Sequence, residues 1–290
     1  MEQINQALER ARQEHMRNLK KVANTSLSKK MNNISIAHKK EITYTKTRAI
    51  PVQNLREKRI ITNQQNSISD AYRILRTQIL QRLHEKDWNL LAISSACSGT
   101  GKSLTSINLA MSIASEVDTT VLLVDADLRA PSLDQHFGFT AEFGLTDYLL
   151  DGKPLDEILV HPEGVPRFVL LPAGKAIENS SEMLSSFKMK NLVDELKHRY
   201  PSRIVIFDLP SILNSSDTLA FLPNVDTTLM VVAEGGTKEA HLKRAFELLQ
   251  GNEVIGTVLN WAYTVDKDHA GLNLKPGWIS RIFSKLGKKI

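Results

Sequence analysis

Residues 96–103 read Ala-Cys-Ser-Gly-Thr-Gly-Lys-Ser, and this stretch decides the fold that we expect. It has the pattern A-x-x-x-x-G-K-S, with Ala at the usual first Gly, between a strand-like run at 90–94 and a helix-like run at 102–115. The N–H groups of such a loop and the N-terminus of the next helix form a concave phosphate site. Lys102 can reach the β- and γ-phosphates of a nucleotide, and the Ser103 hydroxyl can hold Mg²⁺. The stretch predicts a nucleoside triphosphate site with these candidate binding residues: Ser98, Gly99, Thr100, Gly101, Lys102, Ser103 and Leu104.

Two carboxylates end the next strand-like run, Val-Leu-Leu-Val-Asp-Ala-Asp-Leu-Arg. Asp125 and Asp127 are separated by one residue, and positions i and i+2 of an extended chain point to the same side. One carboxylate can help to hold Mg²⁺ and the other can accept a proton from an attacking hydroxyl. Both are therefore candidate catalytic residues together with Lys102, and a solvated acidic turn is the alternative. Arg129 follows and can either bind phosphate or hold Asp127, which the sequence leaves open.

A third carboxylate, Asp208, ends the run Arg-Ile-Val-Ile-Phe-Asp-Leu-Pro. A buried strand of this kind delivers one carboxylate to the shell of a Mg²⁺ ion, usually through water. Ser103, Asp125 and Asp208 are therefore the candidate metal residues. The alternative is a strand that ends in a polar turn.

The remaining chain alternates strand-like and helix-like segments. Continuous apolar runs predict strands that are covered on both faces: Leu90–Ser94, Thr120–Asp125, Phe168–Leu171, Ile204–Asp208, Thr228–Ala233 and Val254–Leu259. Helical patterns are found at Ser69–Leu83, Lys102–Ser115, Thr146–Leu159 with an interruption at Gly152 and Pro154, Ser181–Tyr200, Thr218–Leu222 and Lys238–Gln250. The expected fold is α/β, a doubly wound and mainly parallel sheet flanked by helices, with its ligand at the carboxyl ends of the strands.

Charge divides the 290 residues into three parts. The net charge is +5, but residues 1–66 carry +9 and residues 275–290 carry +5, which leaves −9 for the part between them. We expect a basic N-terminal helix and flexible linker at 1–66, a P-loop domain at 67–265 and a basic amphipathic tail at 266–290. Basic ends suit an anionic membrane surface or an acidic partner. They match no nucleic-acid fold signature, which disfavours nucleic acid.

Two further patterns bear on location. The sequence holds no apolar run of roughly 18 residues and no apolar signal core at its N-terminus, and Cys97 is its single cysteine, which together predict a cytoplasmic chain. Residues 276–290 read as a basic amphipathic helix with Trp278 and Phe283 on its apolar face. This tail predicts contact with a membrane surface, and docking on its own domain is the alternative.

The three motifs in this order resemble the Walker motifs of bacterial tyrosine kinases, the autokinases of polysaccharide synthesis and export. Shorter stretches at Phe143–Leu149, Leu171–Lys175 and Asn179–Leu184 resemble that family too, and residues 199–210 are similar to its branch encoded with exopolysaccharide and exosortase loci. The resemblance covers about residues 67–262. It implies ATP and Mg²⁺ as cofactors, phosphoryl transfer to tyrosine, and a membrane-embedded polysaccharide co-polymerase, on a separate chain, as activator at the inner face of the membrane.

The resemblance also bears on assembly and on the base. The family has a Glu-x-x-Arg-x-x-Arg motif for ring-like self-association, and Asp70, Arg73 and Arg76 stand at its positions with Asp in place of Glu. The alternative is a solvated, salt-bridged helix face. Asn260 matches a position at which related P-loop ATPases contact the base, and an Asn in a turn is the alternative.

The chain departs from the family at its C-terminus, where a cluster of tyrosines is common. Its five tyrosines are Tyr44, Tyr72, Tyr148, Tyr200 and Tyr263, so the phosphoacceptor stays open. Two alternatives to a kinase follow, namely an ATPase switch like those of the MinD/ParA group and a kinase-like scaffold without tyrosine transfer. Cys97 stands where the MinD/ParA loop carries an additional lysine, which disfavours the switch.

Overall fold

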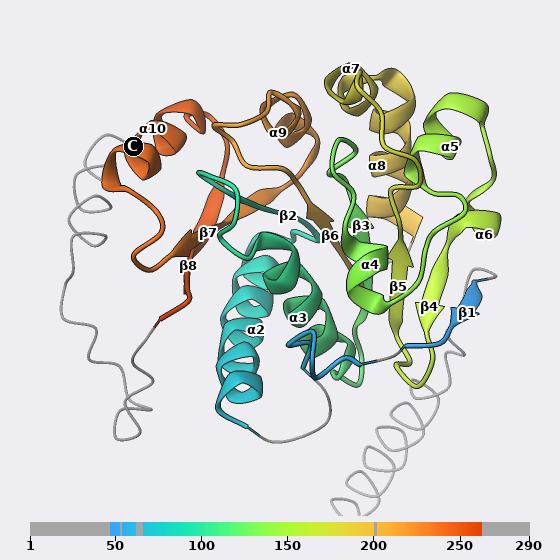
Figure 1. Ribbon diagram of the computed structural model, residues 1–290, viewed down its shortest axis with the longest axis horizontal. Coiled ribbons are helices and arrows are strands. Elements are labelled where there is room, and N and C mark those ends of the chain that lie inside the picture. The colour runs from blue at the N-terminus through green and yellow to red at the C-terminus, as the bar shows by residue number, and fades with distance from the viewer. Residues whose placement is uncertain (1–46, 53, 62–65, 200–201, 263–290) are drawn as a thin grey trace, which may run out of the picture. The chain divides into compact units, whose positions relative to one another are not determined.

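The computed structural model describes residues 47–262 except 53, 62–65 and 200–201, so the expected N-terminal helix and the tail at 276–290 lie outside the described residues. Within this part the strands form one sheet in the order β1-β4-β5-β3-β6-β2-β7-β8 (Figure 1). Their bounds are Arg48–Ile50, Leu90–Ser95, Thr120–Asp125, Val160–Pro162, Phe168–Leu171, Arg203–Asp208, Thr227–Ala233 and Val254–Asn260 for β1 to β8. Neighbouring strands are parallel except β4 and β5, which confirms the predicted mainly parallel sheet.

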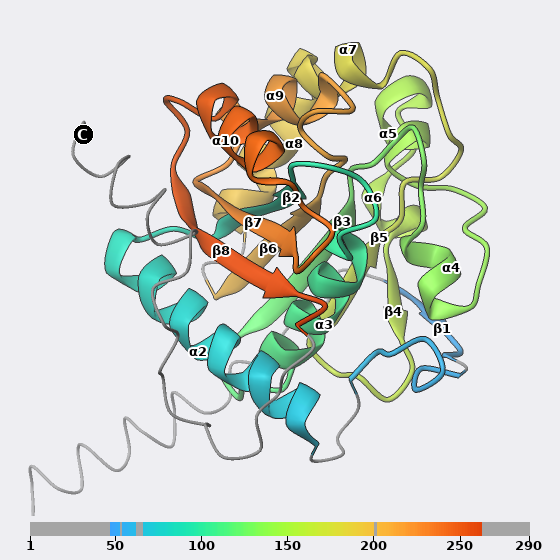
Figure 2. The same cartoon turned by 60° about the vertical axis from the view of Figure 1, so that its left-hand side comes forward.

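Helices cover both faces of this sheet (Figure 2). Their bounds are Ser67–Lys86, Lys102–Ala114, Leu133–Phe137, Leu145–Asp151, Leu155–Ile158, Ser180–Ser185, Phe187–Arg199, Asp217–Phe221 and Glu239–Leu248 for α2 to α10, and a 3₁₀ turn spans Leu222–Asn224. Alternate residues of a strand point to opposite faces. Leu91 and Ile93 of β2 pack with α2 and α3 on one face, whereas Leu90 and Ala92 pack with α8 and α10 on the other. The fold therefore has the three layers of a doubly wound domain.

The start of α2 follows from its first residues. Asn66 accepts a hydrogen bond from the Ser69 N–H at 2.8 Å, and the Ser69 hydroxyl accepts one from the Asn66 N–H at 2.9 Å. This reciprocal capping box satisfies two donors of the first turn. Ile79 and Leu83 on the inner face are buried, in agreement with the predicted helical spacing.

Two predicted helices are each divided in the structure. The segment Thr146–Leu159 is divided at its predicted interruption into α5 and α6, because Gly152 ends α5 in the left-handed region at a φ of 73° and Pro154 precedes α6. The segment Ser181–Tyr200 forms α7 and α8, with extended backbone at Ser186 between them. Local breakers override the helical period in the first case.

Residues 48–61 differ from the flexible linker that their composition predicted. β1 pairs in parallel with β4, and Ile50 and Ile60 are buried in the core. The Ile61 N–H donates to Asn108 Oδ1 on α3 at 2.9 Å. Scattered apolar residues among polar ones conceal this packing from a search for periodicity. In the described part of the chain, no helix combines the length and apolar character that would let it cross a membrane.

Candidate functional site

The predicted site residues gather at one edge of the sheet. The parallel strands β2, β3, β6 and β8 end at this edge. β2 leads into the 96–101 loop, and the other three end at Asp125, Asp208 and Asn260. This is the edge at which doubly wound folds bind ligands. The structure therefore brings the three predicted motifs together.

The loop leaves a helix end open toward solvent. Gly101 is the N-cap of α3 at a φ of 84°, no side chain caps the helix, and its first turn holds no acidic residue. The first N–H groups of a helix have no partner within it. With Ser98 and Gly99 exposed at the tip of the loop, these N–H groups can bind an anion such as phosphate.

Asn260 fastens the end of β8 to this loop. Its side-chain amide donates to the Thr100 carbonyl at 2.9 Å. A Cβ added at Gly101 would lie 2.2 Å from Asn260 Nδ2 and would displace that amide, and the φ of 84° at Gly101 also favours glycine. The predicted contact of Asn260 with a base stays a prediction, and the structure gives the residue this contact with the loop.

Asp125 is fully packed within the site. It is 1% exposed, and its Oδ2 accepts hydrogen bonds from the N–H groups of Ser132 and Leu133, both at 3.0 Å. Burial raises the pKa of Asp125 to about 8, and the neighbouring Asp208 raises it as well. A carboxyl group held in this way favours a proton or a cation.

Asp208 faces Asp125 from β6 and has one oxygen without a partner. Its Oδ1 accepts a hydrogen bond from the Ser106 hydroxyl at 2.9 Å, whereas its buried Oδ2 has no hydrogen-bond partner. Burial raises the pKa of Asp208 to about 6, while the charge of Lys102 lowers it. Two carboxyls and the Ser103 hydroxyl are hard oxygen donors, and Mg²⁺ prefers such donors. The unsatisfied oxygen and the donor set therefore fit Mg²⁺.

Asp127 and Arg129 differ in what they contact. Burial raises the pKa of Asp127, while the Ala130 N–H, which donates to Oδ1 at 3.1 Å, and Lys102 lower it. The carboxyl is half-buried, so a ligand can reach it more readily than Asp125. Arg129 donates instead to the Ser180 hydroxyl and the Glu178 carbonyl, both at 3.3 Å. In this structure Arg129 thus holds the start of α7.

Three residues join the site that the sequence reading did not single out. Ser106 lies one helical turn after Ser103, and that spacing could have indicated it. Ser132 donates its hydroxyl to Ser103 Oγ at 3.4 Å. Asp217 at the start of α9 is 0% exposed, has no hydrogen-bond partner for either oxygen and raises the pKa of Asp127. No motif in the sequence marks Asp217, which is the first residue of α9.

The predicted self-association motif is partly engaged within the chain. Asp70 and Arg73 form an exposed ion pair at 2.9 Å. Arg76 pairs with Glu116 at 2.8 Å and donates to the Ser112 carbonyl on α3 at 2.8 Å. Of the three residues, Asp70 and Arg73 are thus the ones exposed to a neighbour.

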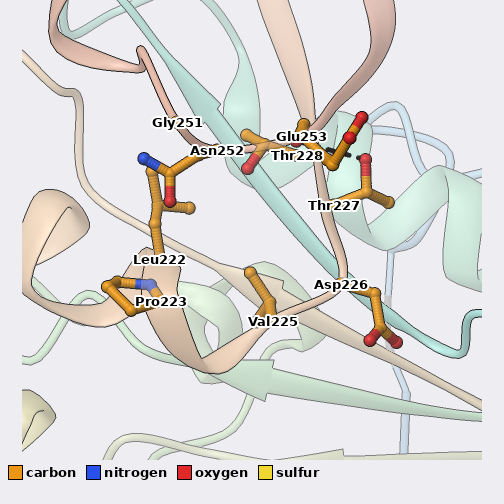
Figure 3. Close-up of a pocket in the computed structure, with 9 residues that line it drawn as sticks. All are labelled: Leu222, Pro223, Val225, Asp226, Thr227, Thr228, Gly251, Asn252 and Glu253. Carbon is orange, nitrogen blue, oxygen red and sulfur yellow. Dashed lines mark hydrogen bonds between the residues drawn. The ribbon is translucent and has the colours of Figure 1, made fainter.

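A separate hollow lies at the opposite edge of the sheet (Figure 3). Thr227 and Thr228, which line it, begin β7, so it is at the amino ends of the parallel strands. The adjacent Asp226 accepts hydrogen bonds from the N–H groups of Asn89 and Leu90 at 3.0 Å. This arrangement orders the start of β2 and is distant from the predicted site along the strands.

Comparison with known proteins agrees with this geometry. Residues 88–235 match the AAA domain family. The tyrosine-protein kinase YwqD of Bacillus subtilis (strain 168) is 33% identical over 194 residues, which are 66% of this chain and 80% of YwqD. The tyrosine-protein kinase ptk of Acinetobacter johnsonii is 31% identical over 69% of this chain, which spans 27% of the length of ptk.

A solved structure gives the same result in three dimensions. The kinase domain of the Escherichia coli tyrosine kinase ETK superposes with a TM-score of 0.63 at 28% sequence identity. The match covers 75% of this chain and 91% of the ETK domain. With its loop, its carboxylates and its sheet order, this chain belongs to the bacterial tyrosine-protein kinases, a family of P-loop NTPases.

Proposed function

We propose that this chain is an ATP-dependent tyrosine autokinase that regulates exopolysaccharide synthesis and export, and that it hydrolyses ATP when no acceptor is present. The observation that carries the proposal is the register of Asp125 and Asp208 beside the open start of α3. Burial raises the pKa of both carboxyls, so the pair does not stabilise the fold by itself. This favours a role in binding a cation. The names of the relatives YwqD and ptk, both tyrosine-protein kinases, support the same activity.

The loop and Lys102 would act on the phosphates. N–H groups at the start of α3 and the Lys102 ammonium group stabilise the negative charge on the transferring phosphoryl group. The candidate binding residues Ser98 to Leu104 would surround the phosphates. Asn260 would hold the loop in place through its hydrogen bond to the Thr100 carbonyl. Phosphoryl transfer depends mainly on such positioning and charge stabilisation.

Ser103, Asp125 and Asp208 would hold Mg²⁺, directly or through water. When bound, the ion neutralises charge between the β- and γ-phosphates. Ser106 and Ser132 position this set, since they hydrogen-bond to Asp208 and Ser103.

Asp127 is the better candidate for the base that accepts the tyrosine proton. The N–H groups of Ser132 and Leu133 occupy Asp125 Oδ2, whereas Asp127 is half-buried, so a tyrosine hydroxyl can reach it, and burial raises its pKa. In the proposed step the tyrosine O–H bond breaks as its oxygen bonds to the γ-phosphorus, the proton goes to Asp127 and ADP leaves.

The proposal extends to assembly. A second copy of this chain would bind at the exposed face of α2 that carries Asp70 and Arg73 beside Ile74, which is 56% exposed. The activator would be a separate membrane-embedded co-polymerase, and the kinase would work at the inner face of the membrane.

The test uses the full chain with Mg²⁺ and ATP labelled at the γ-phosphate, with and without liposomes. Phosphotyrosine on the protein, lost in Lys102→Met and retained in the exposed control Lys190→Met, is the expected result. Phosphate release without labelled protein would favour the ATPase switch instead. A chain that binds ATP with neither product would be a scaffold.

A further inference from the structure

A tryptophan and an arginine from distant parts of the chain meet beside the phosphate loop. Trp261 directly follows Asn260 at the end of β8, and the Arg59 guanidinium carbon lies 5.4 Å from the centroid of its ring. A Cβ added at Gly101 would lie 3.5 Å from Trp261 Nε1, which places the indole edge next to the loop.

Both residues have an unusual backbone. Arg59 has a φ of 59° and Trp261 a φ of 61°, in the left-handed region that bulky residues rarely adopt. Such conformations are strained and persist where the surrounding structure enforces them. Here Asn108 on α3 supplies that enforcement for Arg59. It donates to the Arg59 carbonyl at 3.1 Å and accepts from the Ile61 N–H at 2.9 Å.

The indole is held at its edge and on one face but is still 44% exposed. Exposing a large aromatic surface to water is unfavourable, and this ring does not fill the core. Flat heterocycles stack on tryptophan, and an arginine across the ring strengthens the platform by its cation–π contact. Asn260, the residue before Trp261, donates its amide to the Thr100 carbonyl, which holds the end of β8 and therefore the indole beside the loop.

We propose that Trp261, backed by Arg59, is the platform on which the purine ring of the bound nucleotide stacks. This inference rests on the proposed function, in which the loop holds the phosphates. It adds that the segment around Arg59, which precedes the P-loop domain in the chain, forms part of the nucleotide site. Stacking recognises the flat face of the ring and not its hydrogen-bonding edge, so the platform does not by itself distinguish adenine from guanine.

The test separates the base from the phosphates. Calorimetric titrations of the full chain with Mg²⁺ and either ATP or inorganic tripolyphosphate are compared for the parent and variants. Trp261→Ala is expected to weaken ATP binding about tenfold or more and to leave tripolyphosphate binding unchanged. Trp261→Phe, which retains a ring, should remain within about threefold of the parent, and Arg59→Ala should weaken ATP binding to an intermediate degree.

Fluorescence gives a second readout with a matched control. Trp88 also lies under a cation, with Lys86 Nζ at 5.7 Å from its ring centroid, but it precedes β2 at the opposite edge of the sheet. The change in tryptophan emission upon ATP addition should persist in Trp88→Phe and vanish in Trp261→Phe.

Equal ATP affinity in Trp261→Ala and the parent would overturn the platform, and so would an equal loss of tripolyphosphate binding. A parent chain that binds tripolyphosphate but not ATP would overturn the platform and leave the phosphate loop standing. A parent that binds neither ligand would overturn the proposed function and this inference together.

Discussion

Asp125 and Asp208 occupy opposite positions in the register of β3 and β6, at the last residue of each strand. Each is 1% exposed, so two acidic side chains are buried next to each other. Backbone N–H groups stabilise Asp125 and the Ser106 hydroxyl stabilises Asp208, but burial and mutual repulsion still raise the pKa of Asp125 to about 8. The pair is therefore a source of instability that a bound cation would relieve.

This pair should make stability depend on pH. The pKa of an unfolded Asp is about 3.9, and that of Asp125 in the fold is about 8. Between these values the folded state retains a proton that the unfolded state has released, so the free energy of unfolding falls as pH rises. Asp125→Asn should flatten this decline and be more stable than the parent at pH 8 by on the order of 1 kcal/mol or more. Urea unfolding of the nucleotide-free and Mg²⁺-free protein across this pH range measures it.

The Asn side chain keeps an oxygen that can accept from Ser132 and Leu133, so the variant tests charge more than packing. Asp118→Asn, at an exposed position, is the control and should not alter the slope. An unchanged slope in Asp125→Asn would contradict the assignment.

Removal of Mg²⁺ should weaken nucleotide binding through Asp208. A ligand at about 100 times its Kd stabilises a protein by about 2.7 kcal/mol, which for a domain of this size raises Tm by about 5 to 10 °C. We expect Mg²⁺ with ATP to give a shift of this order and a chelator to reduce it. Asp208→Asn should show the smaller shift whether or not Mg²⁺ is present. A full Mg²⁺-dependent shift in Asp208→Asn would exclude the carboxyl as part of the metal site.

Two glycines of the loop offer a matched comparison. Gly101→Ala places a Cβ 2.2 Å from Asn260 Nδ2, whereas a Cβ at Gly99 meets no atom within 4 Å. Both positions have a positive φ, 84° and 75°, so both substitutions carry a similar backbone cost. Gly101→Ala should displace Asn260 from Thr100 and weaken ATP binding at least about tenfold more than Gly99→Ala does. The loss of this hydrogen bond and the resulting shift of the loop both weaken binding. Equal affinities in the two variants, measured by calorimetry, would show that the Asn260 contact does not matter for binding.

Asp217 should influence Asp127 without touching the nucleotide. Its carboxyl has no hydrogen-bond partner and raises the pKa of Asp127. Asp217→Asn should therefore lower the pKa of Asp127 and move the acid limb of the pH–rate profile to lower pH, while the free energy of unfolding stays equal or rises. A profile that does not move, in a variant that folds, would restrict Asp217 to a structural role.

The sequence predicted those parts of the site that depend on local order. The loop, Asp125 and Asp208 each follow a continuous apolar run, and parallel strands necessarily bring their ends to one edge. Asp217 and Ser132 escaped notice because their role depends on how short helices fold back over that edge. No local pattern links them to the motifs.

In the fold, too, the elements with a local pattern were predicted and those without one were not. Long buried strands were predicted within one or two residues, whereas the three-residue strands β1 and β4 were not, since three residues carry no period. The contact of Arg59 with Trp261 joins positions about 200 residues apart along the chain, and the pairing of Arg76 with Glu116 needs α2 to lie on α3. Such contacts arise from tertiary packing and leave no trace in a single sequence.

The formation of phosphotyrosine by the purified chain decides between a tyrosine kinase, an ATPase switch and a scaffold. The intact protein is incubated with Mg²⁺ and ATP, and mass spectrometry then determines whether a tyrosine has gained a phosphoryl group. We expect modified tyrosine in the parent and in Lys190→Met, and none in Lys102→Met. Binding of ATP by the parent without any phosphotyrosine, in the presence of liposomes as well as in their absence, would contradict it.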